Sequence, residues 1–195
     1  MTKNIKVLQL IDSLQIGGAE VMAVNITNAL YKKGIDSHIV VSRKEGPLKN
    51  RLLSGVGYLF LNRKKMIDFN AVFRFYQYLK KHQISIIHAN ATSWFLAVLM
   101  KILKPSLKIV WHDNFGDSEK LPQRPIILLK MASSFFSLIA SVNYKLQLWA
   151  KNELHTANCI YLPNFVIPLG KLSNSSSDYL KGETGKRILC LANLR

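Results

Sequence analysis

Acidic residues and cysteines are scarce in this chain of 195 residues. Eleven Asp and Glu stand against 27 Lys and Arg, which gives a formal net charge of +16 at pH 7. An excess of this size indicates anionic partners such as phosphates, nucleic acid or an acidic membrane surface, although it says nothing about the fold. The only cysteines are Cys159 and Cys190, each in an apolar run. They exclude a disulfide framework and predict two buried thiols in a reducing compartment, by default the cytoplasm.

Long apolar runs are lacking as well. Residues 94–100 and 131–142 fall well short of the roughly 18 residues of a membrane span. The short run from Ile5 to Ile11 is interrupted by Lys6 and Gln9 and has no cleavage-like site of a signal peptide behind it. We therefore expect a soluble or peripheral protein. With 49% hydrophobic and 19% charged residues, the chain is predicted to bury a sizeable core.

Apolar runs of strand length alternate with helical patterns along the chain. This alternation predicts an α/β fold, a Rossmann-like parallel sheet with helices on both faces. We expect strands at residues 6–11, 37–42, 57–62, 84–90, 107–112, 137–142 and 159–162, and helices at about 19–33, 68–82, 93–104, 125–136 and 144–154.

The composition changes near the C-terminus. Residues 1–167 are expected to form one N-terminal domain, and residues 168–186 have the Ser, Gly, Asn and Lys content of an interdomain linker. Residues 187–195 then repeat a strand pattern. A parallel strand needs neighbours and a covering helix, so we expect this segment to be the first strand of a truncated C-terminal domain. The alternative is that it returns to the edge of the first sheet.

Polar residues follow several of the predicted strands. In open parallel sheets, ligands bind beyond the carboxyl ends of the strands, where the strand order reverses. Two glycines directly before a helix allow an anion to approach free N–H groups, the alternative being a tight turn that needs glycine torsions. A lone histidine at a strand end is more often structural, but two at neighbouring ends favour a site. The rule selects Gly17, Gly18, His88, Asn90, His112, Asp113, Asn143 and Asn164.

Motifs of several enzyme classes are absent. Neither the G-x-G-x-x-G fingerprint nor the G-x-x-x-x-G-K-[ST] phosphate loop surrounds Gly17, and no G-x-S-x-G elbow is present. No histidine or cysteine has a second ligand at metal-site spacing, so no metal is expected. The loop acids Asp113, Asp117 and Glu119 show no paired-carboxylate geometry and are best explained as solvated. Asp113 is the best functional candidate of the three because it adjoins His112.

The segment 62–81 combines basic and aromatic residues. It could lie on an anionic membrane as an amphipathic helix. Equally, an apolar stripe at helical spacing could face the core, and we favour this interpretation, with the flanking cations as candidates for phosphate contact. The stripe consists of Phe69, Val72, Phe73, Tyr76 and Leu79, and the cations are Arg63, Lys64, Lys65, Lys80 and Lys81.

Taken together, the strand-end segments resemble one enzyme family, the GT4-type retaining glycosyltransferases of GT-B fold. The resemblance extends over almost the whole chain and runs through residues 6–20, 86–90, 110–113, 141–143 and 161–164. The Gly-Gly-Ala-Glu opening at residues 17–20 is fairly specific, and the order and spacing of the other segments support it. The resemblance implies an N-terminal acceptor-binding domain, with a nucleotide-sugar donor held mainly by a C-terminal domain across a cleft.

The resemblance also implies roles for single residues. His112, with its neighbour Asp113, is expected in the catalytic set and in contact with the transferred sugar. Asn193 stands where many relatives have a phosphate-binding arginine, which leaves Arg195 as a candidate replacement. The loop that faces the donor diphosphate and acceptor would contain Gly17, Gly18 and Glu20, and the residues expected to bind substrate elsewhere are His88, Asn90, Asn143 and Asn164.

We therefore expect the whole protein to transfer a sugar, with retention of configuration, from a nucleotide sugar to a polysaccharide or lipid-linked acceptor. The expected location is the cytoplasm, with peripheral attachment at the inner membrane face as an option and an anionic membrane surface as a further partner. No cofactor, metal or nucleic acid is expected. Because the family's Glu-x7-Glu region would follow Arg195, residues 1–195 alone should have little turnover.

Two other function classes compete with this expectation. A non-catalytic basic α/β module could bind nucleic acid or an anionic membrane surface, but no recognition helix, RNP or zinc pattern is present. A response-regulator-like domain would need an acidic cluster after the first strand, where only Asp12 stands. Both alternatives rank below the glycosyltransferase.

Overall fold

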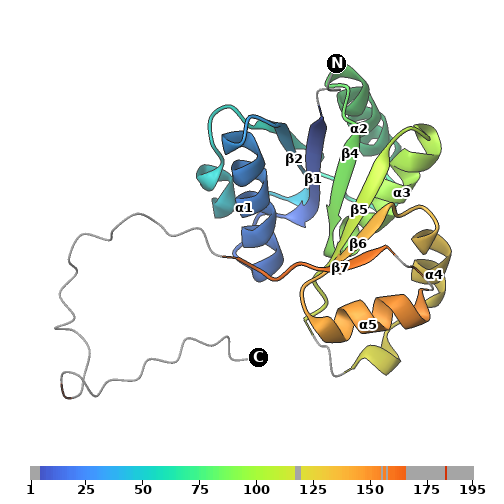
Figure 1. Ribbon diagram of the computed structural model, residues 1–195. Helices are drawn as coiled ribbons and strands as arrows, with labels where there is room; N and C mark the ends of the chain where they lie inside the picture. The colour runs from blue at the N-terminus through green and yellow to red at the C-terminus, as the bar shows by residue number, and fades with distance from the viewer. Residues whose placement is uncertain (1–4, 117–119, 155, 157, 166–182, 184–195) are drawn as a thin grey trace.

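The computed structural model describes residues 5–116, 120–154, 156, 158–165 and 183. Within these ranges it confirms the predicted α/β fold and the alternation of strands and helices (Figure 1). The strands are β1 (Lys6–Ser13), β2 (Asp36–Lys44), β3 (Gly57–Phe60), β4 (Ile86–Asn90), β5 (Lys108–Asp113), β6 (Leu138–Ser141) and β7 (Cys159–Tyr161). The helices are α1 (Gly18–Lys32), α2 (Phe69–Lys81), α3 (Trp94–Leu103), α4 (Ile127–Ser133) and α5 (Tyr144–Glu153), with short 3-10 turns η1 (Pro47–Arg51), η2 (Ala91–Ser93) and η3 (Leu121–Gln123).

The seven strands form one parallel sheet in the order β3-β2-β1-β4-β5-β6-β7. After β3 the chain crosses to the other side of β1, so the strand order reverses between β1 and β4. All strands run in one direction, and their carboxyl ends therefore share one edge of the sheet. This edge, at the β1–β4 boundary, is where an open α/β sheet binds ligands.

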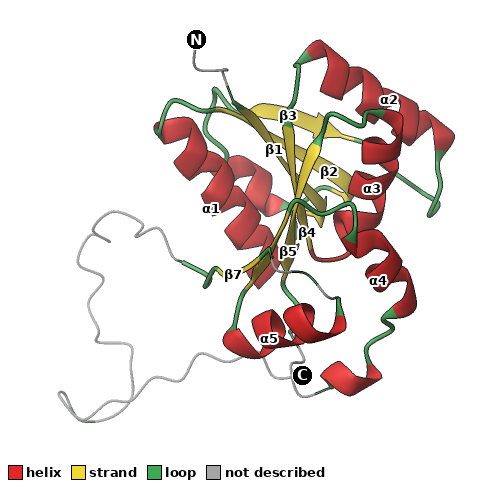
Figure 2. Cartoon of the chain, turned by 45° about the vertical axis from the view of Figure 1, so that its right-hand side comes forward, coloured by secondary structure: helices red, strands yellow, loops and turns green. Residues whose placement is uncertain are grey.

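Helices cover both faces of the sheet unequally. Helix α1 stands on one face, and α2, α3 and α4 stand on the other (Figure 2). Because side chains alternate along a strand, β1 sends Leu8 and Leu10 into the larger core and Ile11 into the smaller one against α1. The larger core also contains the fully buried Trp111 and Phe75. No helix within the described ranges is long and apolar enough to cross a bilayer.

Local signals explain several helix boundaries. Asp68 precedes α2, and its carboxylate accepts the backbone N–H of Ala71 at 3.1 Å. Gly34 ends α1 with a φ of 77°, a left-handed conformation that glycine adopts readily. Pro105 follows two residues after α3 and cannot continue a helix.

The buried face of α2 differs from the predicted one. Phe69 and Phe73 are 82% and 60% exposed, so their assignment to the core was wrong. Leu79 is buried as predicted, and Val72 and Tyr76 pack partly against the core, but the helix also buries Ala71 and Phe75, which were not predicted. The buried face therefore overlaps the predicted stripe but is rotated about the helix axis away from Phe69 and Phe73.

Two further predictions concern the cysteines and the C-terminal segment. Cys159 is a buried free thiol, as predicted, and burial raises its pKa. Cys190 lies outside the described residues. The predicted linker at 168–186, apart from Glu183, and the predicted strand at 187–195 lie outside them too.

Candidate functional site

A buried hydrogen-bond network joins β1 to β4 where the strand order reverses. Asn90 Nδ2 donates to Gln9 Oε1 at 3.0 Å and to the backbone oxygen of Leu10 at 3.2 Å. Gln9 Nε2 then faces His88 Nδ1 at 3.0 Å. An amide nitrogen only donates, so the ring accepts at Nδ1, and a neutral His88 carries its proton on Nε2.

Two histidines stack beside this network. Asn90 pairs in register with His112 of β5, and His88 lies two residues earlier on the same face of the sheet. The rings of His88 and His112 are 5.2 Å apart between centroids and inclined by 22°. The structure thus brings together three of the predicted site residues, from two neighbouring strand ends.

Several buried polar atoms of this cluster lack partners. His88 Nε2, Asn90 Oδ1 and both ring nitrogens of His112 make no hydrogen bond of normal geometry within the described chain. Leaving such a group unsatisfied costs about 1–3 kcal/mol, and most buried polar groups in native proteins have a partner. Donors and acceptors that gather unsatisfied at one place mark a candidate ligand site, here a buried one.

Both histidines are neutral at pH 7. Burial, reinforced by the neighbouring His112, lowers the pKa of His88 to about 3. Burial also lowers the pKa of His112 to about 4, although the nearby backbone of Leu162 opposes the shift. Neutral imidazoles can donate to and accept from hydroxyl groups without carrying charge. The cluster therefore suits a polyhydroxylated ligand better than an anion.

The backbone after β4 is strained. Ala91 has a φ of 49°. This left-handed conformation costs a residue other than glycine roughly 1–2 kcal/mol. Its carbonyl accepts the indole N–H of Trp111 at 3.0 Å, which holds the turn in place. Strain of this kind concentrates at functional sites.

The glycine pair stands at the amino end of α1. Gly17 is extended, with a φ of −163°, so its backbone does not require a glycine. A side chain at Gly17 would meet the Glu20 carboxylate, which is folded against it, whereas nothing lies within 4 Å of a Cβ placed at Gly18. The space around Gly18 is therefore open, while the Glu20 carboxylate lies beside Gly17 at the amino end of α1.

Asp113 is not brought together with His112. Arg124 donates to both of its oxygens, at 2.7 and 3.0 Å, and the carboxylate is only 1% exposed. The guanidinium also lies 4.5 Å from the Trp149 ring and 5.4 Å from that of Trp111. Successive strand residues face opposite sides of the sheet, so the Asp113 side chain lies on the face opposite to His112, the one near α4 and α5.

The remaining predicted residues lie around the same edge. Asn143 caps α5 by accepting the N–H of Leu146 at 2.8 Å. Asn164 is exposed in the segment that runs from β7 across to α1, where Asn25 donates to the Phe165 carbonyl at 3.1 Å (Figure 1). Arg195 lies outside the described residues.

An amphipathic pocket of about 420 Å³ opens beside the β1–β4 boundary. Asp12 lies in it and accepts hydrogen bonds from Thr92 at 2.7 Å, from Ser42 and from Arg63 at 3.4 Å. Arg43 approaches the same carboxylate to 3.9 Å. The apolar walls are Met66, Trp94, Phe95 and Leu128. In the described ranges, no three His, Cys, Asp or Glu side chains gather in a way that could hold a metal ion.

Sequence reasoning missed several of these residues. Gln9 carried a signal, since a polar residue inside an apolar strand is buried and needs partners. Asp12 stood at a strand end but was considered only for a response regulator. Nothing in the sequence indicated a role for Arg124, because only the folded chain brings it to its partner Asp113.

Comparison with known proteins identifies the family. The family model described as Glycosyltransferase Family 4 matches residues 16–156. No curated protein shows significant sequence similarity to the chain.

Solved structures share the fold at low sequence identity. Sucrose-phosphate synthase from Thermosynechococcus elongatus superimposes with a TM-score of 0.61 at 13% identity, over 81% of this chain and 48% of that one. The Anabaena protein Alr3699/HepE, solved in complex with UDP and glucose, superimposes with a TM-score of 0.57 at 15% identity, over 82% of this chain and 44% of that one. MurG of Acinetobacter baumannii superimposes with a TM-score of 0.53 at 13% identity, over 83% of this chain and 47% of that one.

The chain spans less than half the length of each of these structures. Identities this low show a shared fold and nothing finer. The family match rests instead on the sequence, and it covers well over half of the 195 residues. It includes α1, the stacked histidines and the Arg124–Asp113 pair. The chain therefore belongs to Glycosyltransferase Family 4.

Proposed function

We propose that the whole protein transfers a sugar from a nucleotide-sugar donor to a glycan or lipid-linked acceptor, with retention of configuration. The observation that carries the proposal is the cluster of unsatisfied polar atoms on His88, Asn90 and His112 at adjacent strand ends. Family membership supports it, and so does the UDP and glucose bound to the structurally similar Anabaena protein. This domain would bind the acceptor and face the transferred sugar.

The proposed roles follow from hydrogen-bonding chemistry. The Nε2–H of His88 would donate to a substrate hydroxyl, and Asn90 Oδ1 would accept from one. His112 would contact the transferred sugar, and in a site without water such fixed dipoles act more strongly than in solution. The free space at Gly18 and the amino end of α1 would admit the donor diphosphate.

Substrate access needs a local movement. His112 is fully buried, and the segment after β7 lies against it. We propose that substrate displaces residues 162–165. The hydrogen bond from Asn25 to Phe165 links this segment to α1.

The proposal needs no metal or cofactor. The charge of the departing diphosphate would be met by the amino end of α1 and by basic side chains, with Arg195 as one candidate. The proposed location is the cytoplasm, and a second domain would supply most of the donor site.

The test uses the full open reading frame. The purified product is incubated with a panel of nucleotide sugars and candidate acceptors, and released nucleotide and glycosylated product are measured by mass spectrometry. His112→Phe should lower kcat about a hundredfold, as loss of one transition-state hydrogen bond does. The exposed residue Gln77 on α2 provides the control, Gln77→Ala, which should keep wild-type activity.

Three outcomes would contradict parts of the proposal. Activity of His112→Phe within twofold of the wild type would remove this residue from the site, and an inverted anomer by NMR would exclude retention. No transfer with any nucleotide sugar, combined with steeply salt-dependent nucleic-acid binding, would favour the non-catalytic basic module.

A further inference from the structure

Exposed apolar side chains gather beside the Asp12 pocket. We name them the apolar rim: Met66 and Ile67 before α2, Phe69 and Phe73 on α2, and Leu128 and Met131 on α4. Met66 and Leu128 also line the pocket, which joins the two parts of the rim. Phe69 is more exposed than any other large apolar side chain in the described ranges. Ordinary solvation does not account for such a group of side chains.

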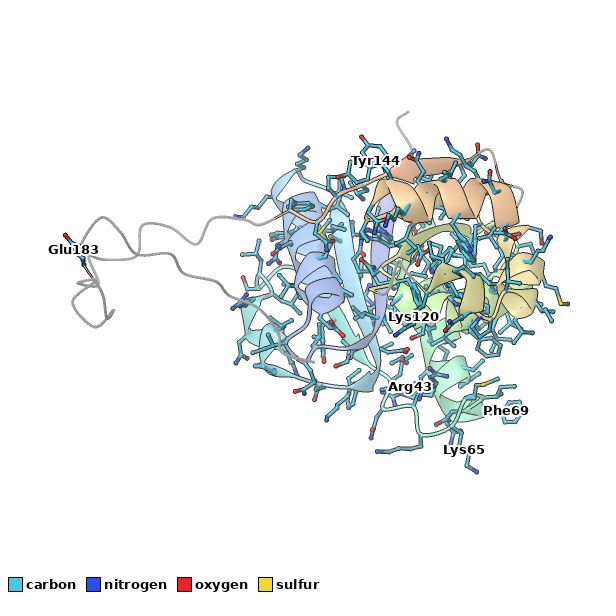
Figure 3. All side chains as sticks on the ribbon, turned by 90° about the horizontal axis from the view of Figure 1, so that it is seen from below. Arg43, Lys65, Phe69, Lys120, Tyr144 and Glu183 are labelled. Atoms are coloured by element: carbon cyan, nitrogen blue, oxygen red, sulfur yellow. The ribbon has the colours of Figure 1, made fainter. Side chains whose placement is uncertain are left out.

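Cations surround the rim. Lys64 and Lys65 line a hollow with Phe69, and Arg43 and Arg63 line the Asp12 pocket. Arg43, Lys65 and Phe69 project on the same side of the domain when it is viewed onto the carboxyl ends of the strands (Figure 3). On α4, Lys130 is exposed beside Met131.

The acids that line the two hollows are Asp12 and Asp68, and both carboxylates accept hydrogen bonds from groups of this chain. Asp12 accepts from Thr92, Ser42 and Arg63. Asp68 accepts from the backbone N–H groups of Ala71 and Lys64. Lys64 and Lys65 are both exposed at this hollow, and Lys65 contributes, after these backbone hydrogen bonds, to the lowered pKa of the Asp68 carboxyl.

We propose that the apolar rim and its cations dock on an anionic lipid bilayer. At the headgroup level, apolar side chains enter the boundary of the acyl chains while Lys and Arg meet lipid phosphates. A net charge of +16 favours approach to such a surface as a whole. The docking surface goes beyond the proposed transferase function and does not depend on it.

One consequence does rest on the proposed function. Docking in this way turns the Asp12 pocket, with its apolar walls and its two arginines, toward the lipid. An acceptor anchored in the membrane could then enter the pocket without leaving the bilayer. Of the two acceptor classes, docking selects the lipid-linked one.

The test measures binding of the full-length protein to vesicles by flotation. Vesicles of phosphatidylcholine alone are compared with vesicles containing one quarter phosphatidylglycerol. Two double variants perturb the surface, Lys64→Glu with Lys65→Glu and Phe69→Ser with Phe73→Ser. Matched controls are Lys80→Glu with Lys81→Glu at the opposite end of α2, and Ile102→Ser with Leu103→Ser at the end of α3, all exposed positions.

We expect binding to the anionic vesicles only, weakened by added salt. Each cation near the surface contributes about fivefold, so the Lys64 and Lys65 variant should bind at least about tenfold more weakly, and the controls should stay within twofold. Equal binding to both vesicle types, equal losses in the two lysine pairs, or no vesicle binding would overturn the proposal. None of these readouts requires sugar transfer, so a failure here leaves the transferase proposal standing.

Discussion

Lowering the pH from 7.5 to 5 is expected to destabilise this fold through His88 and His112. Burial lowers their pKa values to about 3 and about 4, against 6.5 for the ordinary side chain. In the interval between, the unfolded chain binds protons that the folded chain does not, so the free energy of unfolding decreases as the pH is lowered. The loss is small above pH 7 and grows until the pH reaches the folded-state pKa values, about 4 for His112 and about 3 for His88.

The magnitude at pH 5 depends little on the folded-state values. At pH 5 each histidine lowers the free energy of unfolding by about 2 kcal/mol, because pH 5 lies about 1.5 units below the unfolded pKa and each unit is worth about 1.4 kcal/mol. Together they cost about 4 kcal/mol, a large part of the 5–15 kcal/mol typical of a domain. Burial lowers the pKa of His38 too, which adds to the total loss.

The assay is urea denaturation of wild type and His112→Phe at pH 7.5 and pH 5, followed by circular dichroism. Phenylalanine removes only the contact of the ring with the Leu162 backbone, since neither ring nitrogen of His112 has a hydrogen-bond partner of normal geometry in the described chain. The variant should lose about 2 kcal/mol less than the wild type, and Gln77→Ala should behave as the wild type does. Equal losses in His112→Phe and the wild type would refute the reasoning.

Other substitutions test the remaining features. Arg124→Met leaves the buried Asp113 unpaired and should cost about 3–5 kcal/mol in urea unfolding, most of it recovered by adding Asp113→Asn. Gln9→Leu removes the partner of His88 and should cost about 1–3 kcal/mol, measured in the same way. Gly18→Ala should change stability by less than about 1 kcal/mol, because a Cβ at this position has nothing within 4 Å, yet lower sugar transfer by the full-length enzyme more than tenfold.

Hydrophobic periodicity predicted most of the fold because each element buries its own apolar pattern. The strand expected at 84–90 forms at 86–90, and the helix expected at 125–136 is shortened to 127–133. The face of α2 was predicted only in part: Leu79 is buried, but Phe69 and Phe73, which offered a second apolar stripe, are exposed. Which stripe is buried depends on the neighbouring helix and not on the sequence of α2.

The candidate site was partly predictable for a similar reason. His88, Asn90 and His112 end neighbouring parallel strands, so their meeting followed from the sheet rule. Asp113 adjoins His112 in sequence, but alternation along the strand turns it to the other face. Its pairing with Arg124 joins residues across a loop whose path the sequence does not specify.

The network of Gln9, His88 and Asn90 also bears on how the chain folds. It joins residues 79 and 81 positions apart, whereas β1 pairs with β2 after the single helix α1. Closing the longer loop costs more chain entropy, so the β1–β2 unit should form before β4 arrives. The bonds made by Gln9 form only when β4 docks in the correct register. The side chain that orients the candidate site therefore also stabilises the docking of β4, a late and long-range step of folding. We expect Gln9→Leu to slow refolding as well as to destabilise the native state.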